Sequence, residues 1–242
     1  MIKEAIEYVV GLAKPSLINV DGWEFSDKKL FYVNHNPKAD AIKMNTLTSL
    51  VDYIKSNVDA FAEKEKMIIH IKDATCIQLY SSLDYERERE YLVEVNSKTP
   101  NFMFNQFIGH ENFCINVQSK ALDDPETDKA LLLKFAGTVE SGSVAEYGDD
   151  GITQKATVKN GIASKSEAIV PNPVRLKLFR TFLEVDQPVS NFIFRMKQGS
   201  YNDIQCALYE ADGGAWEIEA MNEIKAYLSE ELKDFPNFII LS

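Results

Sequence analysis

The stretch from residue 170 to residue 228 constrains the fold more than any other part of the chain. It begins with a rigid Pro-Asn-Pro turn at 171–173, continues through short segments in which apolar and polar residues alternate, and ends in an amphipathic helix that begins at Trp216. Such alternation is typical of strands, and apolar residues at three- and four-residue steps are typical of a helix with one buried face. The stretch therefore predicts strands that are followed and closed by a helix.

The remaining segments predict an α+β fold with mixed helices and a largely antiparallel sheet. We expect helices over residues 2–13, from Asn45 or Thr46 to 58, over 100–115, from Asp124 to 139 and over 216–232. We expect a hairpin over 17–33 and strands at 67–71, 76–80, 91–95, 152–158, 161–170, 174–185, 191–196, 203–210 and 238–241. Because helices and strands do not alternate regularly, the pattern does not favour a parallel βαβ sheet.

The 242 residues are expected to form one α+β unit spanning residues 1–242. Residues 141–151 form a loop-like, Gly- and Ser-containing stretch. A subdivision at this loop is the alternative, with a helix-rich part at 1–140 and a strand-rich part with the C-terminal helix at 152–242.

The sequence predicts a soluble protein that does not enter a membrane. No apolar run approaches the roughly 20 residues that span a bilayer, and acidic residues stand near the start, where a signal peptide needs a basic segment. We therefore expect the protein to stay in the cytoplasm where it is made. Cys76, Cys114 and Cys206 lie far apart in apolar segments, so they are expected to be buried thiols.

Positive charge is concentrated between residues 152 and 183, although the chain has a formal charge of −11. Together with Arg195, this basic strip supplies the candidate anion-binding residues Lys155, Lys159, Arg175, Lys177, Arg180 and Arg195. Nearby aromatic residues Phe179, Phe182, Phe192 and Phe194 complete the composition of a face that binds single-stranded nucleic acid. The alternative is that the bases face acidic neighbours within the fold or between subunits, and that Phe192 and Phe194 build core.

Asp212, Gly213 and Gly214 precede the last helix and form a second candidate anion site, because helix N-termini favour anions. Ordinary turn chemistry is the preferred interpretation: Asp212 would accept hydrogen bonds from the turn, and the glycines would adopt unusual backbone angles.

No motif predicts catalysis, a metal or a cofactor. His110 and Cys114 have the spacing of a ligand pair, but the second histidine of a His-Glu-x-x-His site is missing. His70 is expected to be a strand residue, and Asp149 and Asp150 to be solvated loop acids. There is no phosphate-binding Gly-x-x-x-x-Gly-Lys loop and no Gly-x-Ser-x-Gly elbow. We therefore expect a protein that is not an enzyme.

Several motifs resemble the YfdQ-like family of bacteriophage and prophage proteins. They are Leu47-Thr-Ser-Leu-Val-Asp-Tyr-Ile54, Pro171-Asn-Pro173, Arg180-Thr-Phe182, Glu184-Val-Asp-Gln-Pro188, Phe192-Ile-Phe-Arg195 and Leu208-Tyr-Glu-Ala-Asp-Gly-Gly-Ala-Trp216. The resemblance covers most of the chain. It implies phage origin, location in the host cytoplasm and an accessory role, and it brings no catalytic residues.

The leading functional hypothesis is a phage-encoded, non-enzymatic accessory protein that acts by self-association or by binding a phage or host protein. Apolar edge strands at Val93 and at residues 238–241 would favour subunit pairing if exposed. One alternative is a single-stranded nucleic-acid-binding helper of phage DNA replication or recombination that uses the basic strip. Another is a shell-forming protein with a capsid-like fold, and a fourth is a binder of a small nucleotide. We expect a homo-oligomer.

Overall fold

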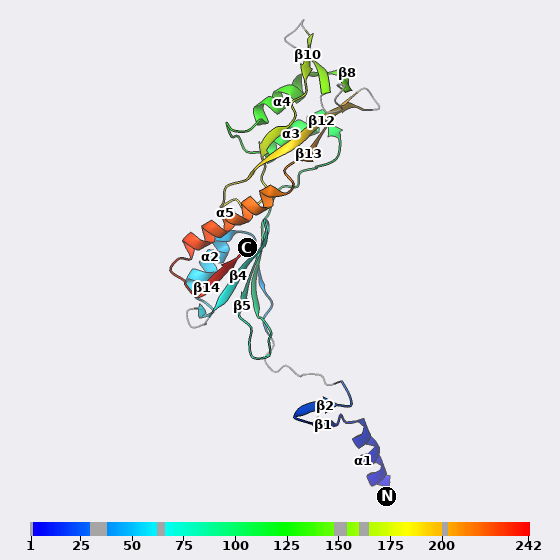
Figure 1. Cartoon of the computed structure of the whole chain (residues 1–242), viewed down its shortest axis with the longest axis vertical. Coiled ribbons are helices and arrows are strands. Elements are labelled where there is room, and N and C mark those ends of the chain that lie inside the picture. Colours follow the sequence, from blue (N-terminus) through cyan, green and yellow to red (C-terminus); the bar gives the residue numbers. More distant parts are fainter. Residues whose placement is uncertain (1, 30–37, 62–65, 148–153, 160–164, 200–202) are drawn as a thin grey trace. The chain divides into compact units, whose positions relative to one another are not determined.

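The computed structural model describes residues 2–29, 38–61, 66–147, 154–159, 165–199 and 203–242 (Figure 1). The chain divides into two compact units, Met1–Ala39 and Asp40–Ser242. The sequence predicted one unit with an alternative subdivision at residues 141–151. The boundary between the two units lies far from that loop.

The first unit contains a helix and a hairpin. Helix α1 (Ile2–Ala13) is followed by strands β1 (Leu17–Val20) and β2 (Trp23–Ser26), which pair antiparallel. Asp21 and Gly22 join the strands with φ of 54° and 85°, and the positive φ at both positions is what a tight hairpin turn requires. The predicted helix is confirmed, as is the hairpin over these residues; positions 30–33 of the prediction lie outside the described residues.

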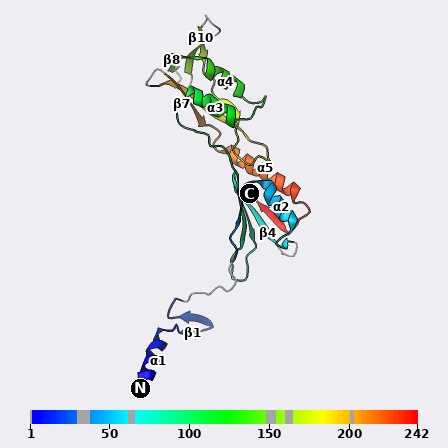
Figure 2. The ribbon, with the colours of Figure 1, turned by 180° about the vertical axis from the view of Figure 1, so that it is seen from behind.

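The second unit has two hydrophobic cores. The first is built on a five-stranded sheet with the strand order β14-β4-β5-β6-β3. The strands are β3 (Ile42–Met44), β4 (Met67–Asp73), β5 (Cys76–Ser81), β6 (Tyr91–Asn96) and β14 (Phe238–Leu241). Helices α2 (Leu47–Ser56) and α5 (Ala215–Glu231) lie against this sheet (Figures 1 and 2). Thr46 accepts a hydrogen bond from the Ser49 backbone N–H at 3.2 Å, which confirms it as the cap of α2.

The C-terminal helix α5 closes a different sheet from the one that the sequence suggested. Its buried residues Ile224 and Leu228 belong to the core of the five-stranded sheet, not to the core of the strands that precede it. The reason is that β14, which follows α5, pairs parallel with β4 and so draws the helix onto this sheet. β14 is an edge strand, as predicted. Val93 is not at an edge, because β6 lies between β5 and β3.

The second core surrounds a four-stranded sheet with the order β11-β12-β13-β7. Its strands are β7 (Ile108–Gly109), β11 (Val174–Lys177), β12 (Val189–Gln198) and β13 (Ile204–Glu210), and its helices are α3 (His110–Lys120) and α4 (Lys129–Thr138). A further sheet, β10-β9-β8, contains β8 (Val139–Tyr147), β9 (Gln154–Lys159) and β10 (Lys165–Ile169). Phe192 and Phe194 are fully buried in the core of the four-stranded sheet, in agreement with the alternative in which they build core.

Four local predictions in this region are wrong. The strand expected at 174–185 ends at Lys177, where β11 gives way to a loop. Residues 100–107 are not helical: Asn105 adopts a positive φ of 60° and its N–H donates to Leu208 O on β13. Asp124 does not cap a helix, because its carboxylate accepts from the nearby Glu126 N–H at 2.8 Å and forms a turn before α4. Residues 141–147 belong to β8, since pairing with β9 overrides their small-residue composition.

The loop at residues 178–188 joins the two cores. Phe182 is 1% exposed within the core of the five-stranded sheet. The Glu184 carboxylate accepts from the Thr48 N–H at 3.2 Å at the start of α2, and the Thr181 hydroxyl donates to Ala74 O at 2.5 Å. This loop contains the Arg180-Thr-Phe and Glu-Val-Asp-Gln-Pro motifs, so their residues serve to hold the cores together.

The α+β class is confirmed, with largely antiparallel sheets. Among the residues that the structure describes, no helix is both long and apolar enough to cross a membrane.

Candidate functional site

Arg180 lies in an aromatic cage between the two cores of the second unit. Its side chain is only 7% exposed, and its Nη2 donates to the Glu210 carboxylate at 2.5 Å. The guanidinium carbon lies 4.5 Å from the centroid of the Trp216 ring, 4.7 Å from that of Phe104 and 5.1 Å from that of Phe192. Cation–π contacts of this kind are strongest where water is excluded.

Burial and the neighbouring carboxylates have opposite effects on the pKa of Arg180. Burial lowers the pKa of the guanidinium, while Glu210, Asp212 and Glu217 raise it. An arginine has so high a pKa that it stays charged in such a site. Arg180 is therefore a fixed cation that is already balanced by neighbouring carboxylates.

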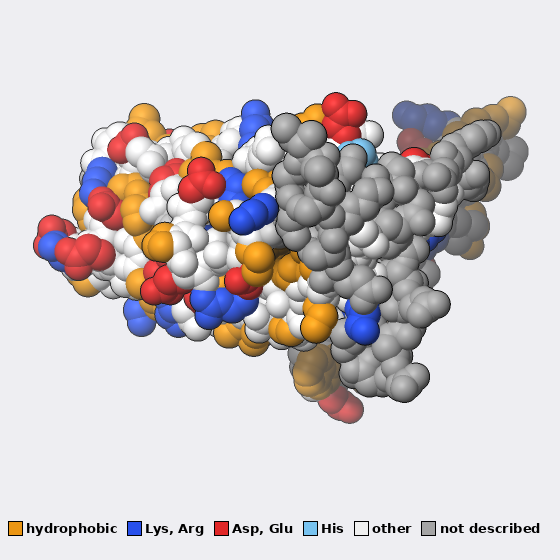
Figure 3. All heavy atoms as spheres, turned by 90° about the horizontal axis from the view of Figure 1, so that it is seen from above, with side chains coloured by type: hydrophobic (Ala, Val, Ile, Leu, Met, Phe, Trp, Pro, Cys, Tyr) orange, Lys and Arg blue, Asp and Glu red, His pale blue; other side chains and the backbone are white. Residues whose placement is uncertain are grey.

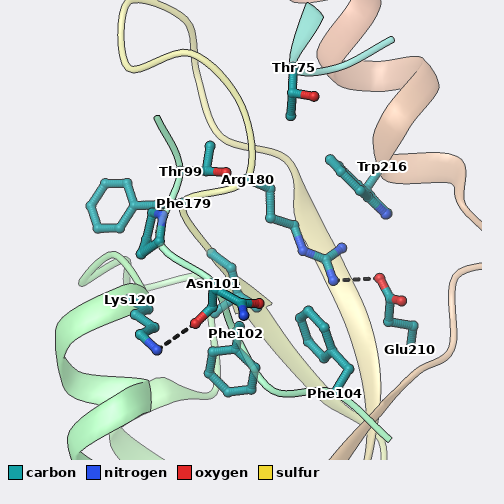
Figure 4. A pocket seen from close by; sticks show the side chains of 12 residues that line it. Thr75, Thr99, Asn101, Phe102, Phe104, Lys120, Phe179, Arg180, Glu210 and Trp216 are labelled. Carbon is teal, nitrogen blue, oxygen red and sulfur yellow. Dashed lines mark hydrogen bonds and ion pairs between the residues drawn. The ribbon is translucent and has the colours of Figure 1, made fainter. Parts of the chain in front are cut away.

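A pocket of about 400 Å³ opens beside this cage (Figure 4). Its walls contain aromatic rings, hydroxyl and amide groups, two cations and one carboxylate. The lining residues are Thr75, Thr99, Pro100, Asn101, Phe102, Phe104, Lys120, Leu178, Phe179, Arg180, Glu210 and Trp216. Pockets of this size and mixed lining are typical of small-molecule sites.

The pocket lies where the chain passes between the two cores. The segment after β6 supplies residues 99–104, the segment after β11 supplies residues 178–180, and the passage from β13 into α5 supplies Glu210 and Trp216. Lys120 reaches it from the last turn of α3, and its ammonium donates to Asn101 O at 2.5 Å. Each element that links the cores therefore contributes a wall.

The basic strip predicted from the sequence is mostly paired with acids or with backbone carbonyls. The Lys177 ammonium contacts Asp186 at 2.8 Å and Asp124 at 3.3 Å, and these carboxylates raise its pKa against the effect of burial. The Arg175 side chain donates to Glu126 O, and its backbone N–H donates to Asp128 at 2.7 Å. These contacts favour the interpretation in which the bases face acidic neighbours within the fold.

The other residues of the strip do not form one surface with them. Lys155 is exposed on β9, and Arg195 is half-buried on β12, on the strand face opposite Phe194. Lys159 lies on β9, and its side chain is outside the described part of the molecule. On the described part of the face in Figure 3, Lys and Arg side chains are interspersed with Asp and Glu.

The Asp212-Gly213-Gly214 segment has the geometry of the preferred turn interpretation. Gly213 and Gly214 have φ of 64° and 84°, and the Asp212 carboxylate accepts from the Gly214 N–H at 3.1 Å. An anion at this position would meet the carboxylates of Asp212 and Glu217. The turn thus places Trp216 in the first turn of α5 beside Arg180.

The remaining candidates do not converge on a metal or a nucleophile. His110 is exposed at the start of α3, whereas Cys114 is half-buried, and burial raises the pKa of its thiol. His70 is a half-buried strand residue on β4. Within the described ranges, no cluster of three or more His, Cys, Asp or Glu side chains could hold a metal ion. Asp149 and Asp150 lie outside those ranges.

The first unit presents a different candidate surface, which is apolar. Large hydrophobic side chains of α1 and of the hairpin are exposed, namely Ile2, Ile6, Tyr8, Val9, Val10, Leu17, Ile18, Val20, Trp23 and Phe25. The face of α1 formed by Ile2, Ala5, Ile6, Val9 and Val10 is here called the helix stripe. Exposed apolar surface that is contiguous marks interaction sites.

Sequence reasoning identified Arg180 but missed the residues around it. Phe104, Lys120, Glu210 and Trp216 come from separate segments, and only the fold brings them together. The apolar residues of positions 2–25 were recognised from their spacing in the sequence. Spacing alone does not show whether the apolar face that they form is covered or exposed. The chain matches no family model, no curated protein and no solved structure.

Proposed function

We propose that the chain is a phage-encoded, non-enzymatic accessory protein that acts by self-association through its first unit, Met1–Ala39. The observation that carries this proposal is the exposure of the helix stripe and of one face of the hairpin. The resemblance of residues 47–54 and 171–216 to phage proteins supports the accessory role.

The helix stripe is too apolar and too short to be stable in water on its own. Ile2, Ile6 and Val9 are 80%, 58% and 64% exposed, and α1 has 12 residues. Isolated helices of fewer than about 12–15 residues are marginal in water, and most helical stability in proteins comes from packing of the apolar face. A partner surface would stabilise α1 by covering this stripe.

The apolar face of the hairpin would also be stabilised by a partner surface that covers it. Ile18 pairs with Phe25 and Val20 with Trp23, so these four side chains share one face of the two strands. Their exposed fractions are 56%, 56%, 50% and 74% in that order. An isolated two-stranded hairpin is also marginal in water. Docking of this apolar face would bury two cross-strand pairs.

A second copy of the same unit is the partner that the charges favour. Residues 1–39 contain five Lys and five Asp or Glu, so the unit has a formal charge of zero, and residues 40–242 carry the whole −11. Two acidic second units repel each other, whereas two neutral first units do not. The polar side of α1 holds Lys3, Glu4 and Glu7, which lacks the basic excess of helices that bind anionic membranes.

The fluorescence of Trp23 tests this proposal. The chain has two tryptophans, so Trp216→Phe leaves Trp23 as the single reporter. We expect the emission of Trp23 to shift to the blue as the protein concentration rises, because association buries this exposed ring. Adding Ile6→Lys should abolish the shift. Adding Glu7→Gln, which changes the net charge by the same amount on the opposite side of α1, should leave it intact. Emission that is independent of concentration would refute the proposal.

A further inference from the structure

We propose that the pocket beside Arg180 binds a nucleoside monophosphate, a ligand that joins a planar ring with N–H donors to an anionic group. This site is independent of the self-association proposed for the first unit. The proposal rests on how charge and aromatic surface are divided within the pocket.

Lys120 supplies the cationic end of the pocket. Its ammonium donates to Asn101 O at 2.5 Å and to the Asn116 side chain, and it lies 6.0 Å from the centroid of Phe102. Among the described residues, no carboxylate forms an ion pair with it. Lys120 is therefore the cation of the pocket that remains available for an anionic group, because Arg180 is already paired with Glu210.

Glu210 supplies an acceptor at the opposite end. One of its oxygens accepts from Arg180 at 2.5 Å, and the side chain is 40% exposed. The carboxylate is therefore accessible to a second donor, such as the ring or exocyclic N–H of a base. Figure 4 shows Lys120 and Glu210 on opposite sides of the pocket, with Asn101, Phe102 and Phe104 between them and Arg180 beside Glu210.

The wall between these ends is aromatic and rigid. Phe102 and Phe104 contact each other with ring centroids 4.8 Å apart, and Phe104 stacks on the buried Phe192 at 5.6 Å. Phe179 and Trp216 complete the apolar lining. Such rings favour a planar ligand, because stacking on an aromatic side chain contributes about 1–3 kcal/mol per base.

The volume also fits this class of ligand. A pocket of about 400 Å³ lies within the range of roughly 300–1,000 Å³ that small-molecule sites occupy. The hydroxyls of Thr75 and Thr99 are on the lining and could hydrogen-bond a sugar. No long polyanion is implied, since Lys120 is the one cation of the described lining that is not already paired with a carboxylate.

The binding test uses the full chain with Trp23→Phe, which leaves Trp216 in the pocket wall as the single tryptophan. Titration with AMP, GMP, CMP and UMP should give a saturable change in Trp216 fluorescence for at least one of them, with the same affinity measured by calorimetry. Lys120→Ala should weaken that affinity by about tenfold or more, the effect of losing a charge-assisted hydrogen bond. Lys134→Ala, an exposed lysine on α4, should have no effect.

The matching nucleoside, which lacks the phosphate, tests the role of Lys120 directly. It should bind more weakly than the nucleotide by a factor similar to that of Lys120→Ala, and Lys120→Ala should no longer distinguish the two. Absence of saturable binding for all four nucleotides would overturn the proposal. Equal binding of nucleotide and nucleoside would overturn the role of Lys120 as the anion partner.

Discussion

The guanidinium of Arg180 is stacked on the indole ring of Trp216, with the guanidinium carbon 4.5 Å from the ring centroid. Arg180 follows a strand of the four-stranded sheet, and Trp216 lies in the first turn of the helix that covers the five-stranded sheet. This contact therefore ties one core of the second unit to the other, and it does so at the wall of the pocket.

Replacement of Arg180 should destabilise the protein strongly. Arg180→Ala removes a side chain that is 7% exposed from between aromatic rings and leaves Glu210 without its partner. We expect a loss of about 2–4 kcal/mol in the free energy of unfolding, measured by urea denaturation. Arg175→Ala is the control, because that side chain is exposed, and it should cost about 1 kcal/mol or less. Equal losses for the two variants would argue against the cage.

Replacement of Gln187 should also destabilise the protein, because its side chain bonds backbone groups of the 178–188 loop. Its side-chain oxygen accepts from the N–H groups of Arg180 at 2.9 Å and Thr181 at 3.1 Å, and its amide donates to Phe182 O at 2.9 Å. Gln187→Ala leaves the buried N–H groups of Arg180 and Thr181 without this acceptor, at a cost of about 2–4 kcal/mol in unfolding free energy. The exposed Gln118 on α3 is the matched control, and Gln118→Ala should change the unfolding midpoint little.

Phe182 and Leu183 offer a comparison between adjacent residues. Phe182 is 1% exposed in the core of the five-stranded sheet, and Leu183 is 71% exposed. We expect Phe182→Ala to lower the free energy of unfolding by about 3–5 kcal/mol, and Leu183→Ala to stay within about 0.5 kcal/mol of the parent. Thermal unfolding followed by circular dichroism distinguishes them. Similar midpoints for both variants would mean that the 178–188 loop does not join the cores.

The fold was predictable from the sequence where local signals and tertiary packing agree. The helix after Thr46 has a good cap and a clear apolar stripe, and it forms α2 as expected. Residues 100–107 show apolar spacing that resembles a helix, but a hydrogen bond from Asn105 to β13 decides their conformation. Asp124 bonds within its own turn, so a pattern typical of a helix cap marks the turn before α4 instead.

The candidate site was less predictable, because its residues are far apart in the sequence. Arg180 was identified as part of a basic strip, but its pairing with Glu210 and its stacking on Phe104 and Trp216 depend on how two cores meet. Charge counting along the chain could not reveal that Lys177 is paired with Asp124 and Asp186.

The rate at which the cysteine thiols are labelled should distinguish the folded from the unfolded protein. Burial raises the pKa of Cys76 and Cys114 above the ordinary thiol value and raises that of Cys206 to about 12. At pH 8 we expect a thiol reagent to label Cys206 in the native protein very slowly, and all three cysteines rapidly in urea. Fast labelling of native Cys206, identified by comparison with Cys206→Ala, would contradict its burial.

The same thiol should make stability fall in alkaline solution. In the unfolded chain a cysteine ionises near pH 8.5, whereas folded Cys206 keeps its proton until about pH 12. Between these values the unfolded state binds fewer protons than the folded state, so the free energy of unfolding decreases as pH rises. The decrease should be smaller in Cys206→Ala.

The central claim is self-association through the first unit, and the mass of the protein in solution tests it most directly. Light scattering coupled to size exclusion near physiological salt should show that the unmodified chain and Glu7→Gln form oligomers. Their mass should be at least twice the 27.4 kDa of one chain. Ile6→Lys should give a lower mass, because it places a charge in the helix stripe. A very large uniform mass would favour the shell-forming alternative for the assembly. A monomer at all concentrations, or an oligomer that Ile6→Lys leaves intact, would contradict the claim.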